Sequence, residues 1–490
     1  MKAILTFFSL LLVIAFPMNA QDFTSSLYET YEKYKEPSLD KRRIKYDQLV
    51  PLINTFRANP KFEVKKVGES IEGRDLNLIS FGKGGTDVFL WSQMHGDEPT
   101  ATQAIFDILN FFDSGDFTKE QKILLANTRL HFLPMLNPDG AEVFQRRNVL
   151  GVDINRDALR LQSPESRTLK KVRDSIDPPF GFNLHDQSRY YNAERTSKPA
   201  TISYLAPAYN YEKDINEVRA RGMQVIVFMN DVIQNYAPGQ VGRYSDAFEP
   251  RAFGDNLMKW GTSSILIESG GYANDREKQE IRKLNYVSIL SALYGIATGK
   301  YKDISLDRYE EIPRNDRKLF DLKIENVTYE IEGNDYILDL GIQRQEIDDA
   351  SHTDFYFKSV IVDQGDLSTY YGYETFDAAG YKIVQPKVTE QAIPGMSNFD
   401  RLMDYEKWVR AGFGYLRTYT VPRDKEHLLA RINLVSKAFE LPIFQLKVGK
   451  NPTFFLEKEG ILTHAVINGF MLDLSQTFQD QKFGNALIYR

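Results

Sequence analysis

The sequence contains no cysteine among its 490 residues. This absence excludes a disulfide framework, and it also excludes a lipid anchor attached to an N-terminal cysteine. The folded protein must therefore rely on its hydrophobic core, and a chain of this length can bury a large one.

The sequence also lacks an excess of positive charge and, beyond its first residues, any long apolar run. Its 61 basic and 67 acidic residues give a formal net charge of −6, which does not indicate nucleic acid as a partner. No segment after residue 20 is apolar over the roughly 20 residues that a membrane span needs. With 42% hydrophobic and 26% charged residues, the composition is typical of a folded protein, and the length predicts two or three domains.

The N-terminal segment differs in composition from the rest of the chain. Lys2 is the only charged residue before Asp22, and residues 4–16 are almost wholly apolar. Because this run is shorter than a membrane span, we predict a signal peptide over residues 1–20 rather than a membrane anchor. The protein is then expected to be exported, and to be periplasmic or secreted.

The next residues, 21–60, are predicted to form a helical lead-in, with a pro-segment as the alternative. From residue 61 to 305, short apolar runs alternate with amphipathic segments. The expected strands are 88–91, 130–135 and 264–267, and the expected helices are 100–112, 165–175, 216–236 and 276–298. This alternation predicts an α/β domain with a mixed, mostly parallel sheet and flanking helices.

A different pattern begins after Tyr301. Short strands are expected at residues 320–325, 329–338 and 355–362, and a single helix at Glu426–Phe439. Residues 312–490 are therefore predicted to form a mainly β accessory region. We expect it to pack on the first domain or to bind a partner, without chemistry of its own.

Histidine is scarce, with six in the chain, and two of them have settings that suit a metal. His95 stands three residues before Glu98, His185 ends an apolar run 87 positions after Glu98, and Glu268 ends another 83 positions later. Two imidazoles and a carboxylate can hold one zinc ion per chain with a position open for water, and a further carboxylate can act as the base. Taken singly, His185 also fits a core histidine, and Glu268 fits a structural ion pair.

Further motifs surround these residues in the order found in a known family. They are His95-Gly-Asp-Glu98, Asn137-Pro-Asp-Gly140, Arg146-Arg-Asn148, Gly151-Val-Asp-Ile-Asn155-Arg156, Ser163-Pro-Glu165, His185 and Ile267-Glu268. With this series, residues ~60–300 resemble the zinc metallocarboxypeptidases, the carboxypeptidase A/B-type peptidases. The resemblance implies the α/β fold of that family, bound zinc, and a peptide or peptide-like substrate.

The resemblance also implies roles in catalysis. His95, Glu98 and His185 would bind the zinc ion. Glu268 would take a proton from the metal-activated water and deliver it to the leaving amine. Arg146 would stabilise the oxyanion that develops beside the metal.

Substrate binding is implied for three more residues. Asn155 and Arg156 would hold the terminal carboxylate of the substrate, for which a guanidinium group is well suited. Tyr244 would correspond to the mobile tyrosine that covers the substrate in this family, with Tyr272 as an alternative. For the oxyanion role, Arg147 is the alternative, although the spacing to the following motif favours its neighbour.

The sequence departs from the family pattern at acidic positions. Asp157 follows Arg156 where the family commonly has asparagine, and Asp186 follows His185 where many members have a small residue. Both could place negative charge near the substrate. Asp255 falls near the region where some members determine side-chain specificity. These departures bear on substrate preference more than on catalysis.

The function predicted from these features is that of an exported zinc metallopeptidase. It would hydrolyse a peptide bond near a free C-terminus, using metal-activated water and a glutamate base. The alternative is a zinc amidase or deacylase that acts on cell-wall peptides or acylated amino acids. A non-catalytic peptide- or glycan-binding protein is disfavoured because all four residues of the metal site and its base are present.

The C-terminal region carries a second, fainter resemblance. Residues 315–475 contain Leu319-Phe-Asp-Leu-Lys-Ile-Glu-Asn326 and Val448-Gly-Lys-Asn-Pro-Thr-Phe-Phe-Leu456, which look like the small β-domain of amidohydrolases. In that family the β-domain flanks a metal-binding barrel, for which residues 385–424 are too few. Chance likeness between hairpin-rich sequences is the alternative explanation.

Overall fold

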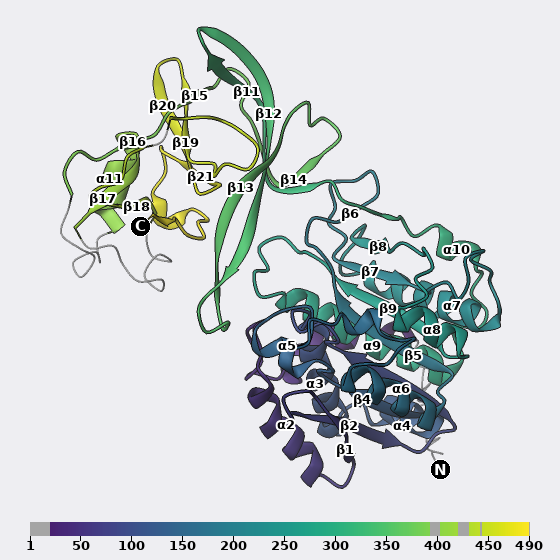
Figure 1. Ribbon diagram of the computed structural model, residues 1–490. Helices are drawn as coiled ribbons and strands as arrows, with labels where there is room; N and C mark the ends of the chain where they lie inside the picture. Colours follow the sequence, from purple (N-terminus) through teal and green to yellow (C-terminus); the bar gives the residue numbers. More distant parts are fainter. Residues whose placement is uncertain (1–19, 393–401, 420–430, 442, 490) are drawn as a thin grey trace, which may run out of the picture.

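The computed structural model describes residues 20–392, 402–419, 431–441 and 443–489 (Figure 1). Residues 1–19, which hold nearly all of the predicted signal peptide, lie outside this range. None of the described helices is long and apolar enough to cross a membrane. The chain forms an α/β region followed by a second region built mostly of strands.

A mixed eight-stranded sheet forms the centre of the first region, in the order β1-β2-β4-β3-β5-β9-β7-β8. Its strands are β1 (Glu63–Glu69), β2 (Asp75–Gly82), β3 (Thr86–Ser92), β4 (Thr128–Leu133), β5 (Phe180–Asp186), β7 (Ile202–Leu205), β8 (Val241–Arg243) and β9 (Ser263–Ser269). Strands β4, β3, β5 and β9 are parallel, as are β7 and β8, whereas the other three pairings are antiparallel. The predicted mixed, mostly parallel sheet is confirmed.

Helices cover both faces of this sheet. The helices are α1 (Ala20–Thr30), α2 (Tyr46–Ala58), α3 (Thr100–Ser114), α4 (Thr118–Asn127), α5 (Pro138–Glu142), α6 (Pro164–Ile176), α7 (Glu217–Ile233), α8 (Phe253–Lys259), α9 (Gln279–Thr298) and α10 (Asp307–Glu310). Alternate residues of a strand point to opposite faces. In β3, Val88 and Leu90 pack in the core that contains α3, α7 and α9, whereas Phe89 and Trp91 pack with α6 and α8.

Strands β3, β5 and β9 end at one edge of the sheet. In their parallel register, Ser92 pairs with Leu184, and His185 pairs with Glu268. Because the carboxyl ends of parallel strands share an edge, the residues that follow β3 meet the last residues of β5 and β9. This edge therefore gathers the candidate metal residues from distant parts of the chain.

The predicted helical lead-in is part of the core of the first region. Phe23 and Leu27 of α1 are buried in the core that also contains α3 and α9. Asp107 of α3 forms a fully buried ion pair with Arg282 of α9, and it accepts a hydrogen bond from Tyr31 Oη at 3.0 Å. The lead-in is thus tied to both helices by apolar and charged contacts.

The second region is mainly β, as predicted. Its elements, with two short partner strands at the junction, are β6 (Asn192–Ala193), β10 (Asn315–Asp316), β11 (Leu319–Ile331), β12 (Asn334–Asp348), β13 (Phe355–Gly365), β14 (Tyr371–Asp377), β15 (Lys382–Val384), β16 (Lys387–Val388), α11 (Leu402–Arg410), β17 (Phe413–Thr418), β18 (Asn433–Ser436), β19 (Phe454–Lys458), β20 (Ile461–Ile467), β21 (Phe470–Asp473) and β22 (Ile488–Tyr489). One sheet has the order β13-β12-β11-β15-β19-β20-β21, with β14 also on β11. A second sheet, β16-β17-β18-β22, is parallel throughout.

Two predictions for this region are wrong. The expected strand 329–338 is a hairpin, because β11 ends at Ile331 and the chain turns at Glu332 and Gly333, with φ values of 52° and 80°. The expected helix Glu426–Phe439 is contradicted by β18, which lies between β17 and β22; residues 420–430 lie outside the described range.

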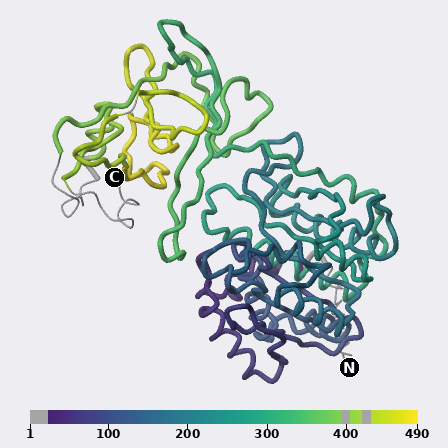
Figure 2. Tube along the Cα trace, viewed as in Figure 1, coloured from purple at the N-terminus to yellow at the C-terminus, as the bar shows by residue number. Residues whose placement is uncertain are grey.

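A long hairpin of the second region reaches the first. Figure 2 shows β12 and β13 extending toward the α/β region. At the base of this contact, Arg43 pairs with Glu346 at 3.0 Å and with Asp348 at 2.8 Å, and its guanidinium lies 3.9 Å from the ring centre of Phe355. Arg42 also pairs with Glu346. The second region therefore packs on the first, which is one of its two predicted roles.

Candidate metal centre

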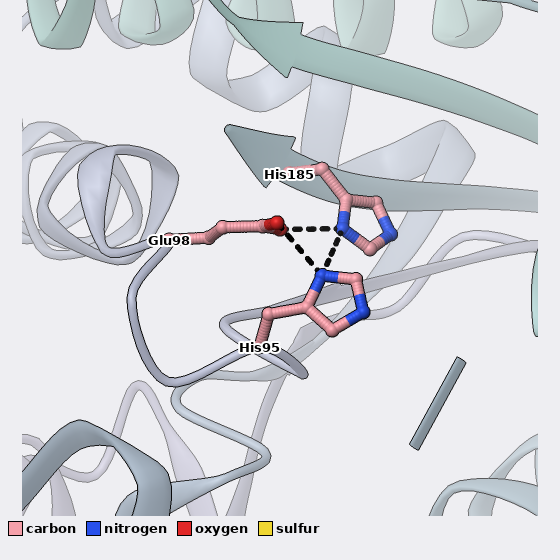
Figure 3. Close-up of side chains that lie close together, drawn as sticks. All are labelled: His95, Glu98 and His185. Atoms are coloured by element: carbon pink, nitrogen blue, oxygen red, sulfur yellow. Dashed lines mark hydrogen bonds and ion pairs between the residues drawn. The ribbon is translucent and has the colours of Figure 1, made fainter. Parts of the chain in front are cut away.

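The three predicted zinc ligands lie together at the edge of the sheet (Figure 3). His95 Nδ1 lies 2.8 Å from Glu98 Oε1 and 3.2 Å from His185 Nδ1, and His185 Nδ1 lies 2.6 Å from Glu98 Oε2. All three side chains are buried. In the described part of the chain, no other group of three or more histidine or acidic side chains is close enough to hold a metal ion.

The donor atoms of this group suit zinc. Imidazole nitrogens and carboxylate oxygens bind zinc at about 2.0–2.2 Å, so donors that share a tetrahedral ion lie roughly 3.3 Å apart. The two histidine Nδ1 atoms are 3.2 Å apart, and they face the same carboxylate. Two nitrogens and one carboxylate, all buried, are the donor set that a zinc ion with an open position requires.

The charges of the three ligands depend on one another. Burial would raise the pKa of Glu98, but His95 and His185 outweigh it and hold the pKa below its ordinary value. For His95, burial would lower the pKa, and the charge of Glu98 instead raises it to about 9. Burial lowers the pKa of His185, so this ring stays neutral. An ionised carboxylate and a neutral imidazole are forms that bind a metal.

Asp153 orients His95 and has no role in the sequence prediction. Its Oδ1 lies 3.2 Å from His95 Nε2, and its Oδ2 accepts a hydrogen bond from Arg146 Nε at 3.0 Å. A carboxylate on Nε2 fixes the ring and leaves Nδ1 for the metal. The available signal in the sequence was its position two residues before Asn155, inside the motif 151–156.

The turn that carries His95 and Glu98 rests on helix α5. Asn137 caps this helix, since its Oδ1 accepts a hydrogen bond from the Gly140 amide at 3.0 Å. A Cβ atom on Gly96 would collide with the Gly140 backbone, so the close contact requires glycine. The stretch 137–140 thus supports the turn that carries two of the ligands.

Glu268 lies beside the ligand group because β9 is paired with β5. His185 and Glu268 are direct partners in the parallel register. Burial, and then the charge of Glu98, raise the pKa of Glu268 well above its ordinary value. A carboxyl group with a raised pKa at the edge of a cavity is suited to accept and return a proton.

Arg146, not Arg147, faces the ligand group. Arg146 Nη1 lies 3.0 Å from His95 Nδ1 and 3.3 Å from Glu98 Oε1. Arg147 instead donates a hydrogen bond to the Gly151 carbonyl at 2.9 Å. The structure therefore brings the predicted oxyanion residue to the metal group and places the alternative away from it.

A cavity of about 360 Å³ opens beside the ligands and includes the three predicted substrate-binding residues. Asn155 Oδ1 accepts a hydrogen bond from the Phe253 amide at 2.9 Å, which orients the side chain. Arg156 Nε lies 3.4 Å from a carboxylate oxygen of Glu249. Tyr244 lines the same cavity, and Tyr272 lies outside it.

The acidic departures have different surroundings. Asp157 accepts a hydrogen bond from the Ser163 amide at 2.9 Å and lies outside the cavity. Asp186 lines the cavity, but Lys278 Nζ lies 2.9 Å from it and offsets its charge. Asp255 also lines the cavity, and burial raises its pKa to about 6. Of the three, Asp255 is the one that could present charge to a substrate.

A larger hollow, of about 620 Å³, lies on the sheet face beside α6 and away from the ligands. His131 lines it, with Ser80 Oγ and Asp87 Oδ1 each 2.8 Å from one of its ring nitrogens. Ser80 and His131 are cross-strand partners in the β2–β4 ladder. Volume alone does not identify the site, because the metal group and the predicted substrate residues line the smaller cavity.

Comparison with known proteins connects the first region to a described family. The sequence model for "Zinc carboxypeptidase" matches residues 52–206. Carboxypeptidase B of Astacus astacus is 36% identical over 241 residues, covering 47% of this chain and 66% of the relative. Probable carboxypeptidase 2 of Trichophyton verrucosum is 31% identical over 134 residues, covering 26% of this chain and 24% of the relative.

The match with several relatives covers only part of their length. For carboxypeptidase E of Caenorhabditis elegans, 32% identity extends over 20% of this chain and 25% of the relative. Among solved structures, a metallo-carboxypeptidase from Burkholderia cenocepacia shares 16% identity, with a TM-score of 0.43 over 52% of this chain and 69% of that chain. The chain spans about a quarter of the length of the fungal and nematode relatives.

Proposed function

Because residues 52–206 belong to the zinc carboxypeptidase family, we propose that the protein is a zinc-dependent metallocarboxypeptidase that removes residues from the C-terminal end of a peptide. The observation that carries this proposal is the convergence of two histidine Nδ1 atoms and a carboxylate beside Glu268. We further propose that the protein is exported, on the grounds of the apolar segment at residues 4–16.

One zinc ion per chain would be held by His95, Glu98 and His185. Bound there, zinc would act as a Lewis acid and make water a better nucleophile at neutral pH. Asp153 would keep His95 turned toward the ion through the bond to Nε2. The donor set supports zinc rather than calcium or magnesium, which prefer oxygen ligands.

Glu268 would move the proton. Its raised pKa suits a group that takes a proton from the attacking water and returns it to the leaving amine. Arg146, at the rim of the ligand group, would donate to the carbonyl oxygen as negative charge develops there. Both groups are needed in the transition state more than in the bound substrate, so their loss should lower kcat.

The cavity suits the C-terminal residue of a peptide. Asn155 and Arg156 would bind its carboxylate, with Tyr244 above it. Leu205 and Pro207 form part of an apolar wall, and Asp255 lies on the same lining. An acidic group in the lining of the pocket favours a basic side chain, so we propose a preference for C-terminal lysine or arginine.

The decisive experiment combines metal content with product analysis. The purified protein is assayed by atomic absorption and offered peptide pairs that differ only in a free or amidated C-terminus. About one zinc per chain and release of single residues from free C-termini alone are expected. Zinc with cleavage of acylated amino acids, but of neither peptide, would replace this proposal with the amidase or deacylase. Zinc-free protein without turnover would contradict both.

A further inference from the structure

The loops that follow the two catalytic strands lead directly to the second region. Arg189, four residues after His185, pairs with Asp321 of β11 at 2.8 Å. Its carbonyl accepts a hydrogen bond from Tyr373 Oη of β14 at 2.6 Å. Gly271, three residues after Glu268, lies so close to Tyr373 that a Cβ atom would collide with the hydroxyl. The second region thus forms part of the surroundings of the site.

Three adjacent hollows lead outward from the metal group, and each shares lining residues with the next. Gln187 lines both the 360 Å³ cavity and a hollow of about 110 Å³ next to it. The small hollow shares Arg189, Asp275 and Arg276 with a third hollow, of about 420 Å³. This third hollow, the outer hollow, has one wall from the first region and one wall from the second.

The length of the intervening chain limits how far the outer hollow lies from the metal group. Because an extended chain spans at most about 3.6 Å per residue, Arg189 is no more than roughly 14 Å along the chain from His185. By the same measure, Ala273 is no more than roughly 18 Å from Glu268. An extended peptide of about four to five residues is therefore long enough to reach from the metal group to the outer hollow.

The wall from the second region has the chemistry of a peptide-binding surface. Phe357, Tyr373, Phe470 and Phe483 contribute rings to it. Lys482 is exposed in the same lining and makes no ion pair with any described residue. In contrast, its arginines are paired, as Arg344 is with a Glu374 oxygen at 3.0 Å. Rings and an unpaired cation favour apolar contacts together with an acidic side chain.

We propose that the outer hollow binds the part of a peptide substrate that lies about four or five residues upstream of the scissile bond, with an acidic side chain beside Lys482. This inference rests on the proposed carboxypeptidase function and specifies its substrate as an extended peptide. The second region is then part of the substrate-binding surface, although the metal and the base belong to the first.

The test uses the full chain and three peptides with the same C-terminal residue: an acylated dipeptide, and two hexapeptides with aspartate or lysine at the first position. We expect kcat/KM for the aspartate hexapeptide to exceed that for the dipeptide about ten-fold, equivalent to ~1.4 kcal/mol. In Lys482→Glu, the ratio of the aspartate to the lysine hexapeptide should fall at least about five-fold and invert. Lys450→Glu, an exposed change elsewhere in the second region, is the matched control.

The possible failures can be told apart. Equal kcat/KM for all three peptides, or a hexapeptide ratio that Lys482→Glu leaves unchanged, overturns the inference while the proposed function stands. Absence of turnover with every peptide contradicts the proposed function. In that case, fluorescence anisotropy of the labelled aspartate hexapeptide decides the inference: equal affinity for the wild type and Lys482→Glu overturns it, and weaker binding to the variant supports it.

Discussion

Two buried polar clusters, one in each region, are arranged in opposite ways. In the first, His95 and His185 turn ring nitrogens toward each other and toward Glu98, and the other nitrogen of His185 is buried without a partner among the described residues. In the second, Asn468 accepts a hydrogen bond from the Ser359 amide at 3.0 Å and donates to the Phe357 carbonyl at 2.8 Å. A buried polar cluster whose members hydrogen-bond to one another stabilises the fold. A cluster that directs several donor atoms toward one point is suited to bind a ligand.

The largest expected effect concerns Glu268, which lies beside the metal ligands. Glu268→Gln removes the proton acceptor but keeps the shape, so kcat on a free C-terminal peptide should fall by about 10²–10⁴-fold, while zinc content stays at the wild-type level. Discontinuous assays of the released product measure kcat, and atomic absorption measures the zinc content. Glu212→Gln, at an exposed position, is the control. Turnover by Glu268→Gln at the wild-type rate would show that another group moves the proton.

The first region also contains a charge pair that serves only the fold. Asp107→Ala leaves Arg282 buried without its partner and breaks the bond to Tyr31, so the free energy of unfolding should fall by about 3–5 kcal/mol. Urea unfolding followed by circular dichroism measures it, with exposed Asp303→Ala as control. A loss below about 1 kcal/mol would mean that the lead-in is not anchored by this pair.

The contact between the regions should depend on pH. Burial would raise the pKa of Glu346, but Arg42 and Arg43 outweigh it and lower the pKa from 4.5 to about 2, with Asp348 close by. Because the folded-state pKa is depressed, the stabilisation is complete above pH 4.5 and is lost as the pH falls toward 2.

Glu346→Gln tests this contact by removing the titrating group. Between pH 7 and pH 3, the wild type should lose up to about 2 kcal/mol more of its unfolding free energy than the variant does. Urea midpoints at both pH values give the difference. Equal losses of unfolding free energy in the two proteins would show that protonation of Glu346 does not weaken the packing of the hairpin on the first region.

The smallest effect is expected for the residue behind the metal ligand. Asp153→Asn keeps a hydrogen-bonding group near His95 Nε2 but removes the charge, so zinc affinity should drop by about 10–100-fold. Competition with a zinc chelator measures it, and Asp303→Asn is the control. If affinity is unchanged, Asp153 supports the loop rather than the metal centre.

The sequence predicted best what depends on short segments. The strands that carry His185 and Glu268 were recognisable as apolar runs, and the metal ligands by their residue types and order. The hairpin turn at Glu332 and Gly333 was missed because the left-handed conformation at the first position is occupied by glutamate rather than by the asparagine or aspartate that mark such turns.

What the sequence could not predict depends on contacts between distant segments. Residues 433–436 lie within the segment predicted as the helix Glu426–Phe439, but they form a strand because β17 and β22 lie on either side. The role of Arg43 follows from a partner in β12 that no local pattern reveals. The outer hollow likewise exists only because two regions meet around loops that follow β5 and β9.

The direct pairing of His185 with Glu268 across β5 and β9 has a consequence for changing the length of this protein. The 82 residues between them can lengthen or shorten in loops without altering the distance between ligand and base, because the sheet fixes it. Deleting one residue within 264–267 would shift β9 by one position and turn the carboxylate to the opposite face. Changes of length should therefore be tolerated in connecting loops outside the substrate cavity, and they should abolish activity within β9, a strand of seven residues.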